Sequence, residues 1–302
     1  MIRIVAPGLR STVQDRGRSG HLRDAVPPAG PADPQAFAAA NALVGDPPGA
    51  AAIEIVGLPF RFVSDDTRVV AATGRDVRIR GRDDLPGWTA VLARAGAEMT
   101  VEGSGRTRYA YLAVAGGIDL PPVLGSRSTY LPAARGPLPR ALAAGDLLPV
   151  GPARAGADRA GRDIRAPAYD VGRIRAVRGP HDDRFERGEM EVFFASTFTA
   201  SGTSDRMGLR LLTSERPLRR PGGELLTCAA LPGAVQVPSG GDPIVLLVDH
   251  QTTGGYAIIA TVIAADIGRI AQATAGDEVR FYEVDREAAV EALRDERRWL
   301  TI

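Results

Sequence analysis

The chain has 302 residues, of which 44% are hydrophobic and 24% charged, and its formal net charge is +1. This length suffices for one large or two ordinary domains, and the absence of a basic stripe interleaved with aromatic residues argues against nucleic acid as the main partner. The N-terminal MIRIVAPGLR lacks the apolar core of a signal peptide, and no apolar run approaches the ~20 residues of a membrane span, so we expect a cytoplasmic protein.

Basic residues are represented by arginine alone, because the sequence contains no lysine among its 37 Lys and Arg positions. The chain therefore has no Walker-type phosphate loop, no Schiff-base lysine and no lysine to carry covalent biotin. The single cysteine, Cys228, cannot form an internal disulfide, and its apolar neighbours favour a small buried residue. The histidines His21, His181 and His250 show no metal-binding spacing, so no metal is expected.

Along the chain, the first charged cluster is Gln14, Asp15, Arg16 and Arg18, which follows a short predicted strand. Arginine offers a planar fork of donors, so this cluster could bind an anion or a carboxylate. A surface turn with self-neutralising charges is the alternative. Glu54 then alternates with apolar neighbours on a predicted strand and should face away from the core, toward solvent or a barrel lumen.

The first convincing helix begins at Asp33–Pro34, with an aspartate cap and a proline in the first turn. Apolar spacing continues through Leu43, and Gly45 is the stop signal. Three further helices are predicted: from about His181 to Ala195, with Asp182 or Asp183 as its cap, over Ala265 to Ala273, and from Asp285 to about Trp299.

Two halves of the sequence show a similar order of elements. A strand over Tyr109 to Ala115 meets a glycine pair and a polar loop that contains Ser126 and Ser128, and an Ala-Gly-Asp turn leads into the next strand. The same order recurs after residue 244. Residues 156–170 are rich in glycine, alanine and arginine without apolar periodicity, which is typical of a linker. We therefore expect a domain over 1–155, a linker over 156–170 and a second domain over 171–302.

The most informative segment is Ile244 to Ile263, IVLLVDHQTTGGYAIIATVI. Two apolar runs flank eight residues, 249–256, that combine carboxylate, imidazole, amide, hydroxyl and phenol groups with two glycines, which would let a ligand approach the backbone. A simple hairpin turn is the alternative. Upstream, Ser204, Asp205, Arg206 and Met207 form another polar cluster, in which Arg206 could bind a carboxylate or a partner, or pair locally with Asp205.

Four long motifs carry a family resemblance. They are STVQDRGRSGHLRDAVPPAGPADPQAFAAANALVGDPPGAAAIEI from Ser11, YLAVAGGIDLPPVLGSRSTYL from Tyr111, SGTSDRMGLRL from Ser201 and GAVQVPSGGDPIVLLVDHQTTGGYAIIATVIAADIGRIAQATAGDEVRF from Gly233. Together they resemble the signatures of the biotin-dependent carboxyltransferase family, also known as allophanate hydrolase subunit 2 or the 5-oxoprolinase C subunit. The resemblance implies a mainly β chain with a few helices, built from two cyclophilin-like β-barrel domains.

The resemblance also implies a function, with three alternatives. The first is the C subunit of a 5-oxoprolinase complex that uses ATP to open 5-oxoproline to glutamate and is inactive as a single chain. Its partners would be a B subunit, which resembles allophanate hydrolase subunit 1, and a lactam-utilisation protein as the A subunit. The second is a carboxyltransferase subunit of a urea-carboxylase-like system that receives carboxybiotin from a partner chain. The third is a regulatory protein that antagonises a kinase inhibitor. Shared motifs do not separate these uses.

The candidate site residues come from these motifs. Asp249, His250 and Thr253 are the candidates for catalysis, since a carboxylate or imidazole could move a proton and a hydroxyl could stabilise an oxyanion. We expect the arginines of Gln14–Arg18 or of Ser204–Met207 to line one cleft with residues 249–256. The candidates for substrate binding are Gln14, Asp15, Arg18, Ser128, Arg206, Gln236, Gln251, Thr252, Gly254, Gly255 and Tyr256.

Overall fold

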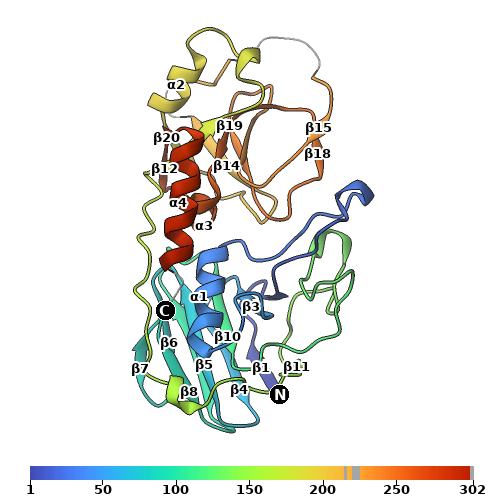
Figure 1. Ribbon diagram of the computed structural model, residues 1–302, viewed down its shortest axis with the longest axis vertical. Helices are drawn as coiled ribbons and strands as arrows, with labels where there is room; N and C mark the ends of the chain where they lie inside the picture. Colours follow the sequence, from blue (N-terminus) through green and yellow to red (C-terminus); the bar gives the residue numbers. More distant parts are fainter. Residues whose placement is uncertain (214–215, 220–224, 300–302) are drawn as a thin grey trace. The chain divides into compact units, whose positions relative to one another are not determined.

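The computed structural model describes residues 1–213, 216–219 and 225–299, and the chain forms two compact units (Figure 1). The first unit comprises Met1–Ser19 and Ala29–Ala168, and the second comprises Gly20–Pro28 and the chain from Tyr169 onward. The chain therefore enters the second unit briefly after residue 19, returns to the first, and leaves it again after residue 168. The predicted N-terminal domain over 1–155 includes residues 20–28, which belong to the second unit.

The first unit consists of two antiparallel sheets and one helix. The six-stranded sheet has the order β11 (Leu147–Leu148), β1 (Ile2–Ala6), β4 (Phe60–Ser64), β9 (Glu98–Gly103), β6 (Val77–Arg80) and β7 (Asp84–Pro86). The five-stranded sheet has the order β2 (Thr12–Gln14), β3 (Ala52–Ile55), β10 (Ala110–Val114), β5 (Arg68–Gly74) and β8 (Ala90–Ala93). One apolar cluster joins Phe60 and Phe62 of the first sheet to Val70 and Leu112 of the second, so the two sheets share a core.

Helix α1 (Pro34–Val44) covers the second sheet by packing on β5 and β10 (Figure 1). The Asp33 side chain accepts a hydrogen bond from the amide of Ala36 at 3.1 Å, and Gly45 ends the helix with a φ of 83°. A left-handed residue at this position favours glycine because it has no Cβ to clash. The predicted start and end of this helix are therefore confirmed.

Glu54 faces neither solvent nor a lumen, and that prediction is wrong. Its side chain is buried, and one carboxylate oxygen accepts hydrogen bonds from the amide of Ala32 and the hydroxyl of Tyr111, both at 2.8 Å. The Tyr111 hydroxyl also accepts a hydrogen bond from the amide of Asp33 at 2.7 Å. Burial in this network raises the pKa of Tyr111 well above its ordinary value. Helix α1 covers the outward face of β3, and Glu54 holds the chain that leads into the helix.

Residues of the predicted linker contact the edge of the second sheet. The amide of Gly161 donates to the carbonyl of Ala90, and the amide of Ala90 donates to the carbonyl of Arg162. The amide of Ile164 donates to the carbonyl of Trp88. This segment therefore satisfies backbone groups on edge strand β8 that would otherwise be open.

The second unit is a closed barrel of seven strands. Its order is β12 (Ile174–Arg178), β19 (Ala257–Val262), β16 (Ala234–Val237), β17 (Ile244–Leu246), β14 (Gly208–Thr213), β13 (Thr197–Ala200) and β20 (Glu278–Glu283), and β12 closes on β20. The β12–β20 pair is parallel and the others are antiparallel. The mainly β prediction is thus confirmed. Strand β16 lies between β17 and β19, so residues 249–256 do not form the turn of a simple hairpin.

In the described part of the second unit, three helices accompany the barrel, and phenylalanine rings pack one of them against it. Helix α2 (Glu189–Ala195) places Phe193 against Phe281 and Phe198 of the barrel, with ring centroids 4.8 and 5.5 Å apart. The predicted helix from His181 is wrong at its start: residues 182–184 form only a 3-10 turn without a side-chain cap. Gly188 has a φ of 90°, which a right-handed helix cannot contain, so α2 begins after it.

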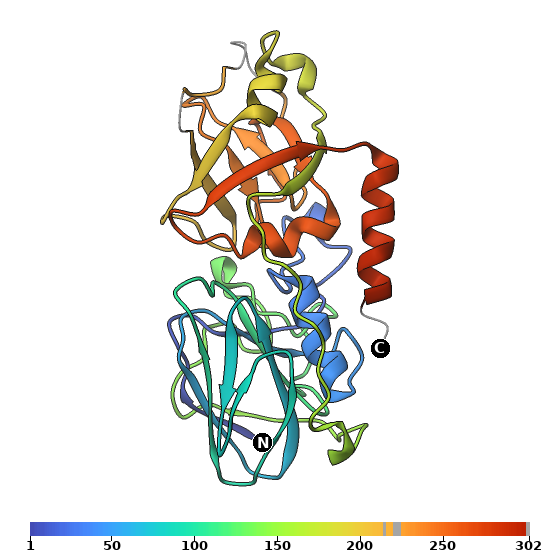
Figure 2. The same cartoon turned by 90° about the vertical axis from the view of Figure 1, so that its left-hand side faces the viewer.

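The last two helices lie close to the predicted ranges. Helix α3 (Ile267–Ala271) follows a 3-10 turn at Ala264–Asp266, and helix α4 (Arg286–Trp299) follows β20, as Figure 2 shows in red. None of the helices in the described ranges is long and apolar enough to span a membrane.

Candidate functional site

The register of three strands creates a polar position on the outer face of the barrel. Leu209, Val235 and Val245 are neighbours across β14, β16 and β17, and all three are fully buried. Since side chains alternate along a strand, the next set of neighbours, Arg210, Ile244 and Gln236, lies on the opposite face. A register shift between Val235 and Gln236 interrupts the pairing of β16 with β19 at this point, as bulges often do beside functional sites.

A two-stranded flap covers this outer face. Strand β15 (Cys228–Ala229) pairs with β18 (Thr253–Gly254), and the amide of Ala230 donates to the carbonyl of Thr252 at 3.0 Å. Beneath the flap, Ala230 packs with residues of β16, β17 and β19 in a small apolar cluster. Cys228 packs against this cluster but is only partly buried, so the prediction of a small buried core residue is wrong in its degree of burial.

A cavity of about 200 Å³ lies on the same face, between residues 203–210, strands β16 and β17, and the loop that carries Gln251 and Tyr256. Gln236 lines it and is 1% exposed, and its side-chain Nε2 has no hydrogen-bond partner among the described residues. Leaving a buried amide donor unpaired costs about 1–3 kcal/mol, so the donor indicates a position for an acceptor on a ligand or a water. The lining residues are Thr203, Asp205, Met207, Gly208, Arg210, Gln236, Ile244, Leu246, Gln251 and Tyr256.

The loop that carries Gln251 and Tyr256 is held at its base by a buried ion pair. The guanidinium of Arg206 donates to both carboxylate oxygens of Asp249, at 2.8 and 3.0 Å, and the amide of Asp249 donates to the carbonyl of Arg206 at 3.0 Å. Both side chains are less than a tenth exposed. The structure therefore brings together two of the predicted polar motifs through the pairing of Arg206 with Asp249.

His250 also supports the loop from within. Its Nδ1 lies 2.5 Å from the carbonyl oxygen of Gln251, and since a carbonyl can only accept, Nδ1 carries the proton. Burial lowers the pKa of His250 below its ordinary value of 6.5, with the Gln251 contact and Asp249 acting in the opposite direction. The imidazole is therefore neutral at pH 7. Its Nε2 is buried without a hydrogen-bond partner in the described ranges, and His250 does not line the cavity.

The rest of the loop is more accessible. Gln251, Thr253, Gly255 and Tyr256 are exposed or nearly so, while Thr252 is half-buried. Gly254 is close to two amides: a Cβ at this position would lie 2.8 Å from Nε2 of Gln236 and 3.4 Å from Nε2 of Gln251. Glycine at position 254 thus leaves room for the amide groups at the edge of the cavity. Thr252, Thr253, Gly254 and Gly255 do not line the cavity themselves.

The other predicted site residues lie in the first unit, where they form a separate network. One carboxylate oxygen of Asp15 accepts from the hydroxyls of Ser126 at 2.5 Å and Ser128 at 2.7 Å, and the other accepts from the amide of Arg127 at 2.6 Å. Arg18 is buried and donates to the carbonyl of Ser128. These contacts join the first motif of the sequence to the second.

Gln14 belongs to the same network and is also buried. Its side-chain Nε2 donates to the hydroxyl of Thr12 at 2.8 Å and to the carbonyl of Thr129 at 3.0 Å, and its Oε1 accepts from the amide of Gly30 at 3.2 Å. All hydrogen-bonding groups of this side chain are thus in use. The Ser204–Met207 motif, not Gln14–Arg18, supplies the arginine that contacts Asp249 within the second unit.

Seven of the ten cavity residues were not predicted as site residues. Thr203, Asp205, Met207, Gly208 and Arg210 lie in or next to the predicted polar cluster at 204–207, and Ile244 and Leu246 are apolar residues of β17. Arg210 was not singled out from the sequence, although it lies in the motif SGTSDRMGLRL. The described residues contain no cluster of three or more His, Cys, Asp or Glu side chains suited to a metal ion.

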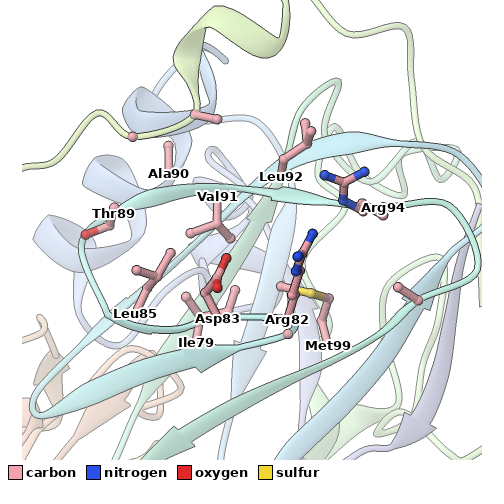
Figure 3. Close-up of a pocket in the computed structure, with 14 residues that line it drawn as sticks. Ile79, Arg82, Asp83, Leu85, Thr89, Ala90, Val91, Leu92, Arg94 and Met99 are labelled. Atoms are coloured by element: carbon pink, nitrogen blue, oxygen red, sulfur yellow. The ribbon is translucent and has the colours of Figure 1, made fainter.

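The first unit contains a larger apolar hollow of about 580 Å³ (Figure 3). Its wall includes Ile79, Leu85, Val91 and Met99, with Arg82 among the polar residues. None of the predicted site residues lines this hollow. Its lining also includes Asp83, Thr89 and Arg94 (Figure 3).

Comparison with known proteins agrees with the motifs. The chain is 37% identical over 302 residues to the 5-oxoprolinase C subunit of Escherichia coli, covering 99% of this chain and 96% of that protein. It is 34% identical to the 5-oxoprolinase C subunit of Haemophilus influenzae, covering 97% and 94%. The crystal structure of the K. lactis urea amidolyase matches with a TM-score of 0.88 and 26% identity over 99% of this chain, which spans 20% of that longer chain. A family model described as carboxyltransferase domain, subdomain A and B, matches residues 24–283, and the chain belongs to this family.

Proposed function

We propose that this chain is the C subunit of an ATP-dependent 5-oxoprolinase complex. The observation that carries the proposal is the similarity to two proteins that bear the name of this subunit, which extends over more than nine tenths of each chain. A C subunit implies other subunits, and we propose that they are a B subunit of the allophanate hydrolase subunit 1 type and a lactam-utilisation protein as the A subunit. The chain would then act as one part of a hydrolase.

The chemistry of a lactam explains why several subunits are needed. The amide carbon of 5-oxoproline is a poor electrophile. Transfer of the terminal phosphoryl group of ATP to the amide oxygen turns that oxygen into part of a phosphate leaving group and releases ADP. Attack of one water at the same carbon and opening of the C–N bond then give γ-glutamyl phosphate, and hydrolysis by a second water yields glutamate and phosphate. This chain has no lysine for a Walker-type loop, so the proposal places ATP on another subunit.

The cavity lined by Gln236, Gln251 and Tyr256 is the proposed contact with the amide substrate. The unpaired Nε2 of Gln236 would donate to the amide oxygen, and donors aimed at an oxygen where charge develops stabilise the transition state. Gln251 supplies a second amide at the cavity, 3.4 Å from that of Gln236. Arg210 lies in the same wall, and its guanidinium suits the carboxylate of 5-oxoproline.

Asp249 and His250 have a different proposed role from the proton transfer suggested by their chemistry. Both oxygens of Asp249 are held by Arg206, and His250 donates to the backbone of Gln251. Neither residue lines the cavity. We therefore assign both as positioning residues for Gln251, and we assign substrate contact to Gln236, Gln251 and Tyr256. Thr253 lies in β18 and supports the flap.

The test is reconstitution of the complex with its partner subunits. We expect ATP-dependent release of glutamate from 5-oxoproline by the complex and none by this chain alone. Gln236→Glu keeps the shape but replaces a donor with an acceptor, and it should lower kcat by about 10²-fold or more if the donor serves the transition state. Gln35→Glu on α1, outside the cavity, is the matched control and should be close to wild type. A fully active Gln236→Glu complex would exclude this role of the cavity.

A carboxyltransferase of the urea-carboxylase type is the second candidate function. The observation that favours it is the structural similarity to urea amidolyase, with a TM-score of 0.88. In that case carboxybiotin would arrive on a partner chain, because this chain has no lysine to carry it. Transfer of carboxylate from a biotin-bearing partner to urea, without activity on 5-oxoproline, would replace the first proposal with this one.

A further inference from the structure

A second polar hollow, of about 480 Å³, lies in the first unit. Five segments line it: the chain after α1, the turn after β10 that begins at Gly116, the chain after β11, and the segments that carry Arg16 and Arg127. Two of its arginines, Arg16 and Arg127, come from the first and second sequence motifs. All of its lining residues belong to the first unit, and none of them lines the cavity that contains Gln236.

The floor of this hollow is backbone held in place by buried charges. Asp46 is 6% exposed, and its carboxylate accepts from the amide of Gly116 at 2.9 Å. Arg68 donates to the carbonyls of Ala115 and Gly151, both at 2.8 Å. A Cβ at Gly116 would lie 2.2 Å from the carbonyl oxygen of Gly151, so the two segments approach too closely for any other residue. A fixed, side-chain-free floor lets a ligand reach the backbone.

Arg127 is fixed at the wall of the hollow. Its backbone amide donates to Asp15 at 2.6 Å, its Nε to the carbonyl of Leu120 at 2.5 Å, and one terminal nitrogen to Asp119 at 2.9 Å. The hydrogen bonds of Asp15 therefore help to hold Arg127 at the wall of this hollow. Because the side chain is already ordered, binding through it would cost little conformational entropy.

Two further arginines complete the wall. The side chain of Arg16 lies against Gly49, where a Cβ would be 2.5 Å from its Nε. Arg154 lies on the opposite segment, after β11. Within the described ranges, neither guanidinium forms an ion pair or a side-chain hydrogen bond. The three arginines thus face two carboxylates, of which Asp119 pairs with Arg127 and Asp46 is held by backbone amides.

From this arrangement we propose that the hollow binds the phosphate group of a small molecule. Guanidinium groups match the oxygens of phosphate, and two guanidiniums without ion pairs match the two negative charges of a phosphate monoester near neutral pH. The volume exceeds that of the phosphate alone, and Pro47, Ala50 and Pro152 offer apolar surface to the remainder of the molecule. The proposal does not depend on the reaction assigned to the second unit.

The test is a titration of the full chain with inorganic phosphate, followed by NMR of the arginine Nε–H groups at constant ionic strength. We expect saturable shifts for Arg16, Arg127 and Arg154. Arg16→Ala and Arg154→Ala should each weaken phosphate binding by about tenfold or more, the loss expected for one charge-assisted hydrogen bond. Arg106→Ala is the matched control, because Arg106 is an exposed arginine of the same unit outside the hollow.

Three outcomes would overturn the proposal. The first is a titration without saturable shifts. The second is an equal effect of Arg106→Ala, which would indicate nonspecific attraction to arginine. The third comes from a parallel titration with succinate: if the dicarboxylate binds as tightly as phosphate, the hollow recognises carboxylates and not phosphate. Circular dichroism of each variant separates lost binding from lost folding.

Discussion

Arg206 and Asp249 illustrate how a single pair of residues can define the site. Their charges are buried, and their two hydrogen bonds join the 204–207 segment to the loop 249–256. A buried carboxylate without its partner is costly, whereas an exposed pair contributes little. Loss of either residue should therefore destabilise the loop.

Arg206→Ala should lower the free energy of unfolding by about 3–5 kcal/mol, because it leaves Asp249 buried and uncompensated. Arg178→Ala breaks an exposed pair with Glu283 and should leave the free energy of unfolding nearly unchanged, because solvent screens an exposed pair. Chemical denaturation of the two variants measures the difference. Equal losses would show that the buried pair does not support the loop.

His250 should make stability depend on pH. Its pKa in the folded chain lies below its ordinary value of 6.5 because of burial, so the unfolded chain binds the proton at a higher pH than the folded chain does. The free energy of unfolding should therefore decrease as the pH falls from about 6.5 toward the folded pKa. His250→Gln should flatten this decrease, whereas His21→Gln should preserve it. An unchanged pH profile for His250→Gln would contradict the prediction.

At the scale of elements, the β15–β18 flap covers the barrel face next to the cavity. It covers Gln236 and carries Gly254 against the two side-chain amides. The neighbouring Gly255 has far more room, since the nearest atom to an added Cβ lies 3.9 Å away. Alanine substitutions at these two adjacent glycines therefore differ in whether the new Cβ contacts the Gln236 amide.

Gly254→Ala should displace the amide of Gln236 and lower turnover of the complex by about tenfold or more, since small displacements of catalytic groups are costly. Gly255→Ala should retain most of the activity. Thermal unfolding of both variants should remain similar, because neither glycine has a positive φ. Steady-state kinetics decides: comparable activity in both variants would mean that the Gln236 amide is not a substrate contact.

For the whole molecule, the flap region also presents apolar surface. Leu226 is 92% exposed and Leu231 is 58% exposed, and both flank β15. Exposed apolar groups beside polar ones are typical of protein interfaces. We expect this surface to contact the proposed B subunit, so that the partner covers the cavity in the complex.

Leu226→Glu and Leu231→Glu should weaken binding of the B subunit by about tenfold or more, because each buries a charge in an apolar contact. Leu9→Glu, at an exposed leucine of the first unit, is the control. Size-exclusion chromatography with light scattering at micromolar concentrations measures co-elution. Normal co-elution of both flap variants would place the interface elsewhere.

Local sequence was sufficient for several features of this protein. The Asp33 cap, Pro34 and Gly45 specify α1 because each acts on the backbone within one turn. The long motifs indicated the family, which the family model confirms, whereas the site at 249–256 stays a prediction. The absence of lysine excludes a P-loop and covalent biotin from composition alone.

Tertiary structure decided which of these groups meet. Strand order places β16 between β17 and β19, so Gln236 reaches the cavity although it lies well before the loop in sequence. Arg206 pairs with Asp249, which lies 43 residues further along the chain, and Glu54 is buried because α1 covers its strand. Such contacts follow from strand pairing and burial over long sequence separations, and a local pattern contains no information on the side chains that another strand will bring.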